Sequence, residues 1–327
     1  MVGQRACARN FLDRASKAAA PLTQTEVSSQ PPVISASGIP LLRFLCLLAA
    51  NLMLRLSGIF IYPVKSCRGF ALPAAEVDAL GFAGDRRFLV VDESGRFLTQ
   101  RSHPRMALIA TALTDESLTL TANGHGSVAT PRTSPAGART VSVTVWKSEN
   151  LLADDCGDEA ADWLGSFLST RCRLVRIGEK FRRPVLKKAA RPGDQVDFAD
   201  AVPFLLISQS SLDDLNDRLV AKGEDALPVD RFRPNLVVTG SAPYAEDGWS
   251  RLRIGPIAFR NAGPCSRCIV TTTDQETAVR GKEPLRTFAT YRRDPDNHTD
   301  VNFGANLIHE SHAGRLSIGD AVEVLPS

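Results

Sequence analysis

From residue 54 onward the chain consists of short apolar runs, alternating or continuous, separated by Gly, Pro, Asn and Asp. Runs of this length between turn-forming residues are typical of β-strands. Residues 93–95, Glu-Ser-Gly, have the chemistry of a hairpin turn, and residues 123–138 have the composition of a surface loop. We expect strands over residues 54–64, 87–91, 96–100, 106–113, 117–122, 140–146, 235–239 and 252–260, and a closing strand or hairpin over 316–325.

Two segments have helical periodicity instead. Residues 158–168 place five apolar side chains on one face: Ala161, Trp163, Leu164, Phe167 and Leu168. Residues 211–221 repeat leucine at helical spacing, with Ser210 and Asp213 resembling a capping box and Gly223 suited to the C-terminal cap. The basic, proline-containing residues 176–192 separate the two helices and are expected to form a domain boundary or a loop over the active site. These patterns predict a mostly β protein of α+β type with a few helices, closed into barrels because many short strands must hide their edges.

The composition and charge of the chain exclude some classes of protein. With 327 residues, 43% of them apolar and 23% charged, the chain can bury a large core in one domain or two. The net charge is only +3, and no basic run is interleaved with aromatic residues, so we expect no nucleic-acid partner. Seven irregularly spaced cysteines are unlike the framework of a small secreted domain and indicate a reducing compartment, which we take to be the cytoplasm.

The first 53 residues differ from the rest. Ser, Ala, Pro and Gln dominate to about residue 38, and an apolar stretch follows over residues 41–56. Only eleven residues lie between Arg43 and Arg55, fewer than the roughly 20 that a membrane-spanning helix requires, so no span is expected. The stretch also begins too far along for a simple secretory signal. We interpret residues 1–53 as an extension, or as the product of a start upstream of Met53, and its targeting role is left open.

The clearest candidate for chemistry is a C-x-x-C pair, Cys265 and Cys268, within residues 263–273 (GPCSRCIVTTT). A zinc site would need two more ligands, but the only close histidine pair is His309 and His312 and there is no second C-x-x-C. A redox dithiol is expected at a helix N-terminus, whereas the β-branched run that follows favours a strand or a turn. Two cysteines packed as small apolar residues would not suit Ser and Arg neighbours. A single thiolate bound to molybdenum or another soft metal remains, and residue chemistry identifies neither the metal nor the cysteine.

Several polar residues follow or precede predicted strands and would suit an anionic ligand. Lys65 and Ser66 follow the first strand and could present an ammonium, a hydroxyl and backbone amides to a phosphate. Arginine matches phosphate or a heterocycle with several acceptors, and the sequence supplies it in two further places. Each of these residues could equally form a solvated turn or a surface salt bridge. The candidates are Arg86 and Arg87, then Arg231, Arg233 and Asn235.

Eight markers in one order resemble the MOSC family, named for the C-terminal domain of molybdenum cofactor sulfurase, and in particular its branch containing the mitochondrial amidoxime-reducing component. The markers are YPVKSC (62–67), DR (85–86), QRSHPRM (100–106), DCGDEAADWL (155–164), PFLLIS (203–208), FRPN (232–235), YAEDGW (244–249) and CSRCIVTTTD (265–274). The resemblance implies an N-terminal β-barrel domain over residues 54–176 and a MOSC β-barrel domain over residues 177–327, with a molybdenum cofactor of the molybdopterin type in a cleft between them.

The resemblance also implies residue roles. The second cysteine of C-S-R-C, here Cys268, would ligate molybdenum and be the catalytic residue. The pterin and its phosphate would be held by Lys65, Ser66, Arg86, Arg233, Asn235, Ser266 and Arg267. Cys265 receives no role. Ala201 and Val202 stand where mitochondrial relatives carry hydroxyl residues, so hydrogen bonds to the cofactor are expected to be missing there.

Members of this branch reduce small N-hydroxylated compounds to amines, and we expect the same reaction here. The chain has no cysteine after Cys268 that could belong to a fused iron-sulfur domain, so electrons are expected from a separate ferredoxin, flavodoxin or reductase. The alternative is a module that carries the molybdenum cofactor or handles its sulfur without reductase turnover. Sulfurase activity itself is not expected, because a chain this short has no evident pyridoxal-phosphate domain.

Overall fold

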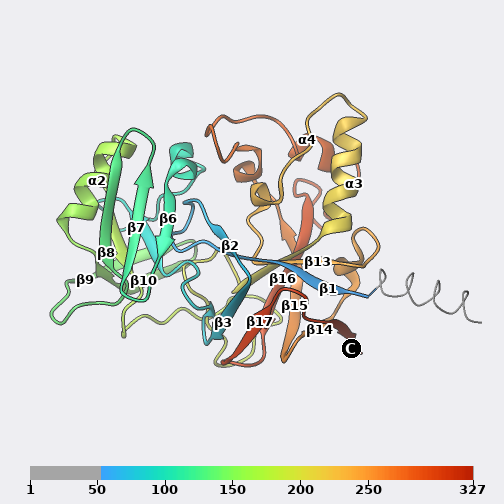
Figure 1. The fold of residues 1–327 in the computed structure, drawn as a ribbon, viewed down its shortest axis with the longest axis horizontal. Helices are drawn as coiled ribbons and strands as arrows, with labels where there is room; N and C mark the ends of the chain where they lie inside the picture. The colour runs from blue at the N-terminus through green and yellow to red at the C-terminus, as the bar shows by residue number, and fades with distance from the viewer. Residues whose placement is uncertain (1–52, 327) are drawn as a thin grey trace, which may run out of the picture. The chain divides into compact units, whose positions relative to one another are not determined.

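The structure is a computed structural model that describes residues 53–326, and the interpretation of residues 1–53 therefore concerns a segment that, apart from Met53, lies outside it. The described chain is mostly β with a few short helices, as the sequence predicts (Figure 1). The helices are α2 (Asp158–Leu168), α3 (Gln209–Val220) and the single-turn α4 (Leu285–Phe288). No helix within residues 53–326 has both the length and the apolar character needed to cross a bilayer.

The largest sheet has eight strands. Its one parallel pair joins β12 and β13, and every other neighbouring pair is antiparallel. Strand β1 pairs with β13 although about 180 residues separate them in sequence, so the beginning of the described chain is part of the same sheet as its end (Figure 1). In order the strands are β18 (Val322–Leu325), β14 (Arg251–Ile254), β15 (Ile257–Ser266), β16 (Asn302–His309), β12 (Phe204–Ser208), β13 (Leu236–Thr239), β1 (Arg55–Ile61) and β2 (Phe70–Leu72).

Three smaller sheets complete the fold. In the four-stranded sheet, β11 pairs antiparallel with β5, the strand that begins two residues after Arg86. The four-stranded sheet is β5 (Phe88–Val91), β11 (Arg173–Arg176), β10 (Ser148–Asp155) and β9 (Thr140–Val145); the three-stranded sheets are β17 (Gly314–Ser317), β3 (Ala74–Asp78) and β4 (Gly81–Phe82), and β6 (Ala110–Leu113), β7 (Ser117–Ala122) and β8 (Gly126–Pro131).

Phenylalanine rings fill the core behind the large sheet. The Phe204 ring lies edge-on to Phe82 and to Phe259, with ring centroids 4.9 Å and 5.3 Å away. All three side chains are fully buried, and such edge-to-face pairs add to the free energy gained by burial. This cluster fixes β12, whose first two residues, Phe204 and Leu205, line the cleft described below.

The predictions for α2 and β7 agree with the structure residue for residue, and those for β1, β5, β9 and β13 differ by a few residues at their ends. One strand prediction was wrong in its first half: residues 106–113 begin inside the 3₁₀ helix η1 (Pro104–Leu108), and only β6 follows as a strand. Pro104 explains the difference, because its fixed φ and missing N–H suit the first turn of a helix.

Two further expectations about this region need correction. Residues 96–100 form only isolated bridges, one between Val91 and Phe97 and another between Arg96 and Thr144, rather than a strand. The predicted turn is present, with the Asp92 carboxylate accepting from the backbone N–H of Ser94 and of Arg96 at 2.9 Å each. Residues 123–138, expected to be a loop, contain β8, in which Val128 and Thr130 point inward at the spacing of two that a strand requires.

The C-terminal half adds three differences. Residues 252–260 are two strands, β14 and β15, joined at Gly255, which has a φ of +50°. Residues 316–325 are not one strand or one hairpin, because β17 and β18 belong to different sheets. Helix α3 begins two residues earlier than predicted, so Ser208 rather than Ser210 is the N-cap residue; the hydroxyls of the two serines lie 2.7 Å apart.

Candidate functional site

A cleft of about 240 Å³ lies where the loops after β1 and before β5 meet the loops before β13 and after β15. All eight residues that the resemblance assigns to the cofactor or the metal line this cleft, although they come from four separate stretches of the sequence. They are Lys65, Ser66, Arg86, Arg233, Asn235, Ser266, Arg267 and Cys268. The structure therefore brings the whole predicted set together.

Backbone hydrogen bonds hold the first two stretches side by side. The N–H of Lys65 donates to the carbonyl of Phe88 at 3.0 Å, and the N–H of Arg86 donates to the carbonyl of Tyr62 at 2.9 Å. The loop that leaves β1 is thus bonded to the residues that open β5. Because both loops are fixed by main-chain bonds, the side chains of Lys65 and Arg86 enter the cleft from a defined position.

Cys268 stands between the end of β15 and the 3₁₀ helix η4 (Ile269–Thr272) and is partly exposed to the cleft. Its Sγ lies 3.1 Å from Nη2 of Arg101, and the Sγ of Cys265 lies 3.0 Å from Nη1 of Arg267. Both thiols are free, as are the other cysteines of the described chain. Each sulfur therefore lies within hydrogen-bond distance of a guanidinium.

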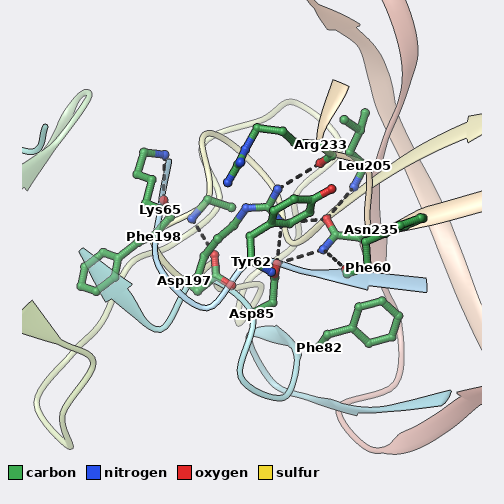
Figure 2. Close-up of polar contacts among 12 residues, drawn as sticks. Phe60, Tyr62, Lys65, Phe82, Asp85, Asp197, Phe198, Leu205, Arg233 and Asn235 are labelled. Carbon is green, nitrogen blue, oxygen red and sulfur yellow. Dashed lines mark hydrogen bonds and ion pairs between the residues drawn. The ribbon is translucent and has the colours of Figure 1, made fainter. Parts of the chain in front are cut away.

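Asp85 lies at the buried base of the cleft and binds three of the residues around it. Its carboxylate is completely buried and accepts from the backbone N–H of Tyr62 at 2.7 Å, from the side-chain amide of Asn235 at 2.9 Å and from Nη1 of Arg86 at 2.5 Å (Figure 2). The Asn235 carbonyl oxygen in turn accepts from Arg86 at 3.0 Å. Burial favours the neutral guanidine, but the Asp85 carboxylate outweighs it and raises the pKa of Arg86. Arg86 is thus a fixed, fully charged donor.

Two guanidinium groups lie over the ring of Tyr62. The Cζ atom of Arg86 is 4.6 Å from the ring centroid, and that of Arg233 is 4.3 Å away. The Tyr62 hydroxyl donates to the carbonyl of Pro234 at 3.1 Å, which fixes the ring. Arg233 differs from Arg86 in having no carboxylate partner among residues 53–326, and its Nη2 has no hydrogen-bond acceptor. Burial accordingly lowers the pKa of Arg233.

Lys65 is held at the other end of the cleft. Its side chain is 5% exposed, and Nζ donates to the carbonyl of Phe198 at 2.8 Å and to the carboxylate of Asp200. Burial lowers the pKa of Lys65 to about 8, although Asp200 opposes the shift. The protein atoms around the Asp200 carboxylate disfavour its charge, but attraction to Lys65 outweighs this and holds the pKa of Asp200 well below its usual range, although 62% of the Asp200 side chain is exposed. The Lys65 ammonium therefore remains charged at neutral pH.

Three of the cleft residues have a left-handed backbone, which is unusual for residues with side chains. The φ angle is +68° at Ser66, +42° at Arg86 and +58° at Arg233. Each such conformation costs on the order of 1–3 kcal/mol and persists only where the surrounding contacts enforce it. Strain of this kind concentrates at ligand-binding sites, and here it falls on three residues around one cleft.

The structure also adds residues that the sequence did not single out. Arg101, Lys187 and Asp200 line the cleft beside the predicted set. Arg101 lies within the marker QRSHPRM and Lys187 within the basic residues 176–192, so both carried a signal, whereas Asp200 carried none. Ala201 and Val202, the two positions where mitochondrial relatives carry hydroxyl residues by the resemblance, also line the cleft.

Two arginines that the sequence offered as further clamps point elsewhere. Nη2 of Arg87 pairs with the carboxylate of Asp78 at 2.7 Å, and Nη2 of Arg231 pairs with that of Asp274 at 3.0 Å. Neither lines the cleft. Within residues 53–326 no three His, Cys, Asp or Glu side chains gather into a metal-binding group, so the additional ligands that a zinc site would need are not found there.

Family comparison decides what kind of protein has this arrangement. Residues 53–171 match the MOSC N-terminal beta barrel domain, and residues 193–323 match the MOSC domain. Mitochondrial amidoxime-reducing component 1 of Mus musculus is 38% identical over 282 residues, which are 82% of this chain and 81% of the mouse protein. The chain belongs to the MOSC family. The resemblance drawn from the eight sequence markers is thereby confirmed.

This MOSC protein is also similar to other known proteins. The human mitochondrial amidoxime-reducing component 1 is 37% identical, with 82% of each chain covered. A molybdenum cofactor sulfurase of Danio rerio is 32% identical over 82% of this chain, but the match spans only 34% of the fish protein. Among solved structures, the YUAD protein of Bacillus subtilis matches 83% of this chain and 95% of its own with a TM-score of 0.32 and 11% identity, too little to support an argument.

The cleft of this MOSC protein fits an anionic, sulfur-ligated cofactor. Arg86 and Lys65 are paired with carboxylates, but Arg233 and Arg267 have no ion-pair partner within the described chain, and Nη2 of Arg233 and Nε of Arg267 are buried without an acceptor. Unpaired buried guanidinium groups are costly unless a ligand completes them. A phosphate or pyrophosphate-like group would supply the missing acceptors, and Cys268 offers a thiolate to a soft metal at the same cleft.

Proposed function

We propose that this protein is a molybdenum-cofactor-dependent reductase that converts N-hydroxylated compounds to the corresponding amines or amidines. The observation that carries the proposal is the convergence of Cys268 with unpaired Arg233 and Arg267 in one cleft of a MOSC protein. The names of the mouse and human relatives, which are amidoxime-reducing components, support the reaction class.

In this proposal the cleft residues have distinct roles. Cys268 provides the thiolate ligand to molybdenum, and Arg233 and Arg267 donate to the anionic end of the cofactor. Ser66, Ser266 and Asn235 line the same surface, with Asn235 acting chiefly to hold Arg86 through its bond at 3.0 Å. Lys65 supplies a positive charge that Asp200 balances only in part, because the Asp200 side chain is 62% exposed and solvent screens the pair.

The reaction consumes two electrons and two protons and releases water, so that R–NHOH becomes R–NH₂. When bound in this cleft, the cofactor would supply the two-electron chemistry of the reduction. The chain's own contribution is orientation and charge: Arg101, 3.1 Å from Cys268 Sγ, is placed to donate a hydrogen bond to an oxygen beside the thiolate. Electrons come from a separate ferredoxin, flavodoxin or reductase, a part of the proposal that rests on the family resemblance.

We further propose that residues 54–176 form the N-terminal β-barrel domain and residues 177–327 the MOSC domain, following an extension over residues 1–53. The matches over residues 53–171 and 193–323 support this division. For the location of the protein, the names of the amidoxime-reducing relatives favour the mitochondrion, and nothing among them supports the cytoplasmic location expected from the cysteine content. Fractionation of cells that express the tagged chain separates the two.

The function is tested on protein from a host that makes the cofactor. Chemically reduced viologen replaces the unknown electron donor, and conversion of benzamidoxime to benzamidine is followed chromatographically. We expect turnover by the wild-type protein, loss of turnover in Cys268→Ser and retention in Cys265→Ser. Cofactor that moves readily from this protein to an apo-enzyme, together with no turnover under any donor, would support the carrier function instead.

A further inference from the structure

A second, larger cavity opens beside the cofactor cleft. Its volume is about 770 Å³, against about 240 Å³ for the cleft, and lies within the range of sites that hold drug-sized ligands. The two hollows have five lining residues in common: Thr99, Arg101, Lys187, Asp200 and Ala201. A molecule in this cavity, which we call the side chamber, therefore borders the cleft that contains Cys268.

Apolar side chains form a wall of the side chamber. The Phe97 and Trp146 rings lie edge to face with centroids 4.8 Å apart, and Leu186 and Val196 complete the apolar lining with Pro184. Trp146 is 41% exposed and Leu186 is 66% exposed, and both line the chamber, so their apolar surface is open to a ligand there. Nε1 of Trp146 donates to the carboxylate of Asp200 at 3.1 Å, which holds the indole in place. This wall suits a flat aromatic ring.

The charges of the side chamber are nearly all positive. It is lined by five cations, Arg96, Arg101, Lys147, Arg183 and Lys187, and by one acid, Asp200. The acid is already paired with Lys65, whereas none of the five cations forms an ion pair with a carboxylate within residues 53–326. Arg183 is buried and donates to the backbone carbonyls of Asp197 and Ala199 at 2.6 Å each, so its charge is not neutralised. The chamber thus has a net positive charge facing a small ligand.

Arg101 connects the two hollows. Its guanidinium carbon lies 4.3 Å from the Trp146 ring centroid, while its Nη2 lies 3.1 Å from Cys268 Sγ. An aromatic compound resting on the apolar wall can direct a polar substituent past Arg101 toward the thiolate. Lys147 lines only the side chamber and is exposed, so its ammonium can meet an anionic group of the same compound.

We propose that the side chamber is the substrate site and that it selects aromatic N-hydroxylated compounds bearing a carboxylate over neutral and cationic ones. This rests on the proposed function for its reaction, but binding to the chamber does not depend on turnover. The apolar wall accounts for the aromatic ring, and the unpaired cations account for the charge preference.

Binding is measured without the reaction by using amides that resemble the substrates but cannot be reduced in the same way. The probes are 4-carbamoylbenzoate (anionic), benzamide (neutral) and 4-(aminomethyl)benzamide (cationic), titrated against the full chain with and without cofactor. Trp146 is one of three tryptophans and the one that lines the chamber, so quenching of its fluorescence reports occupancy, and Trp146→Phe identifies the signal. We expect the anion to bind roughly tenfold more tightly than the cation, since one or two partly screened charge contacts are worth about that factor.

Lys147→Gln is expected to weaken binding of 4-carbamoylbenzoate by roughly fivefold and to leave benzamide unchanged, because a single partly exposed charge contact contributes about 1 kcal/mol. Lys180→Gln removes the same charge from an exposed residue outside the chamber and is the matched control. Equal affinities for the three probes, or equal effects of the two substitutions, would overturn the inference. So would loss of cofactor from Lys147→Gln, which would place the charge in the cofactor site instead.

Turnover then separates this inference from the proposed function. The loaded protein is given 4-carboxybenzamidoxime, benzamidoxime and 4-(aminomethyl)benzamidoxime, and kcat/KM is compared. We expect the carboxylate to be preferred, with the preference falling as salt is raised. Reduction of all three compounds with equal kcat/KM would contradict the substrate preference alone. If none is reduced but the anionic probe still binds selectively, the reductase function is contradicted and the binding site is supported.

Discussion

Asp85→Asn removes the one negative charge that holds the floor of the cleft. The Asp85 carboxylate is fully buried and accepts three hydrogen bonds, from the Tyr62 N–H, from the Asn235 side chain and from Arg86. An asparagine keeps the size but leaves Arg86 without a charged partner. In either orientation of the amide, its NH₂ group also faces at least one of the three donors. Breaking a buried ion pair by removing one member costs about 3–5 kcal/mol, and this range sets the expected loss in the free energy of unfolding.

The loss is measured by urea unfolding, followed by circular dichroism, and by the melting temperature. For a domain of this size about 3–5 kcal/mol corresponds to a fall in Tm of roughly 6–20 °C. Asp115→Asn is the matched control, because Asp115 is fully exposed and meets Arg132 only at 3.5 Å, so its removal is expected to cost about 0.5 kcal/mol or less. An Asp85→Asn protein as stable as this control would refute the view that Asp85 positions Arg86 through a buried ion pair.

Three further changes test other parts of the structure. Arg233→Gln is expected to lower cofactor content, measured by molybdenum analysis, while leaving the free energy of unfolding of the cofactor-free protein unchanged or higher, because Nη2 of Arg233 is buried without an acceptor; a clear loss of stability would contradict this. Burial, reinforced by the Asp85 charge, raises the pKa of Asp197 to about 7, so its carboxyl stays protonated in the fold at pH values where the unfolded chain has lost that proton. Stability should therefore fall as pH rises from about 4 to about 7, and Asp197→Asn should reduce that fall, as measured by unfolding at several pH values; an unchanged pH profile would disprove the assignment. Phe204→Ala, which removes the ring between Phe82 and Phe259, is expected to cost about 3–5 kcal/mol in urea unfolding, and a cost near that of a surface change would mean that the cluster does not support β12.

Local pattern predicted the elements whose neighbours are close in sequence. Helix α2 was predicted with its exact bounds because its apolar face and its ends are encoded within eleven residues. The pairing of β1 with β13 could not be predicted from pattern, since nothing local in Arg55–Ile61 specifies a partner about 180 residues away. The errors at Pro104 and in residues 126–131 have the same origin, because a helix-starting proline and a strand of Gly, Ser and Thr give weak or opposing local signals.

The site was predictable only through the resemblance. Residue chemistry at Cys265 and Cys268 favoured a thiolate bound to a soft metal but identified neither the metal nor the cysteine, and it gave no reason to connect them with Lys65, some 200 residues earlier. The markers supplied that connection, and the structure brings the named residues to one cleft. Asp200 was missed because its role depends on the ammonium of Lys65, and Arg87 was over-interpreted because its partner Asp78 is visible only in the fold.

The central claim is that Cys268 is the molybdenum ligand. Elemental analysis of wild-type protein, Cys268→Ser and Cys265→Ser, all purified from a host that makes the cofactor, tests it most directly. The two cysteines are three residues apart and both line the cleft, so Cys265→Ser controls for loss of a thiol. We expect stoichiometric molybdenum in the wild type and in Cys265→Ser and none in Cys268→Ser; molybdenum retained by Cys268→Ser, or zinc in place of molybdenum in the wild type, would contradict the claim.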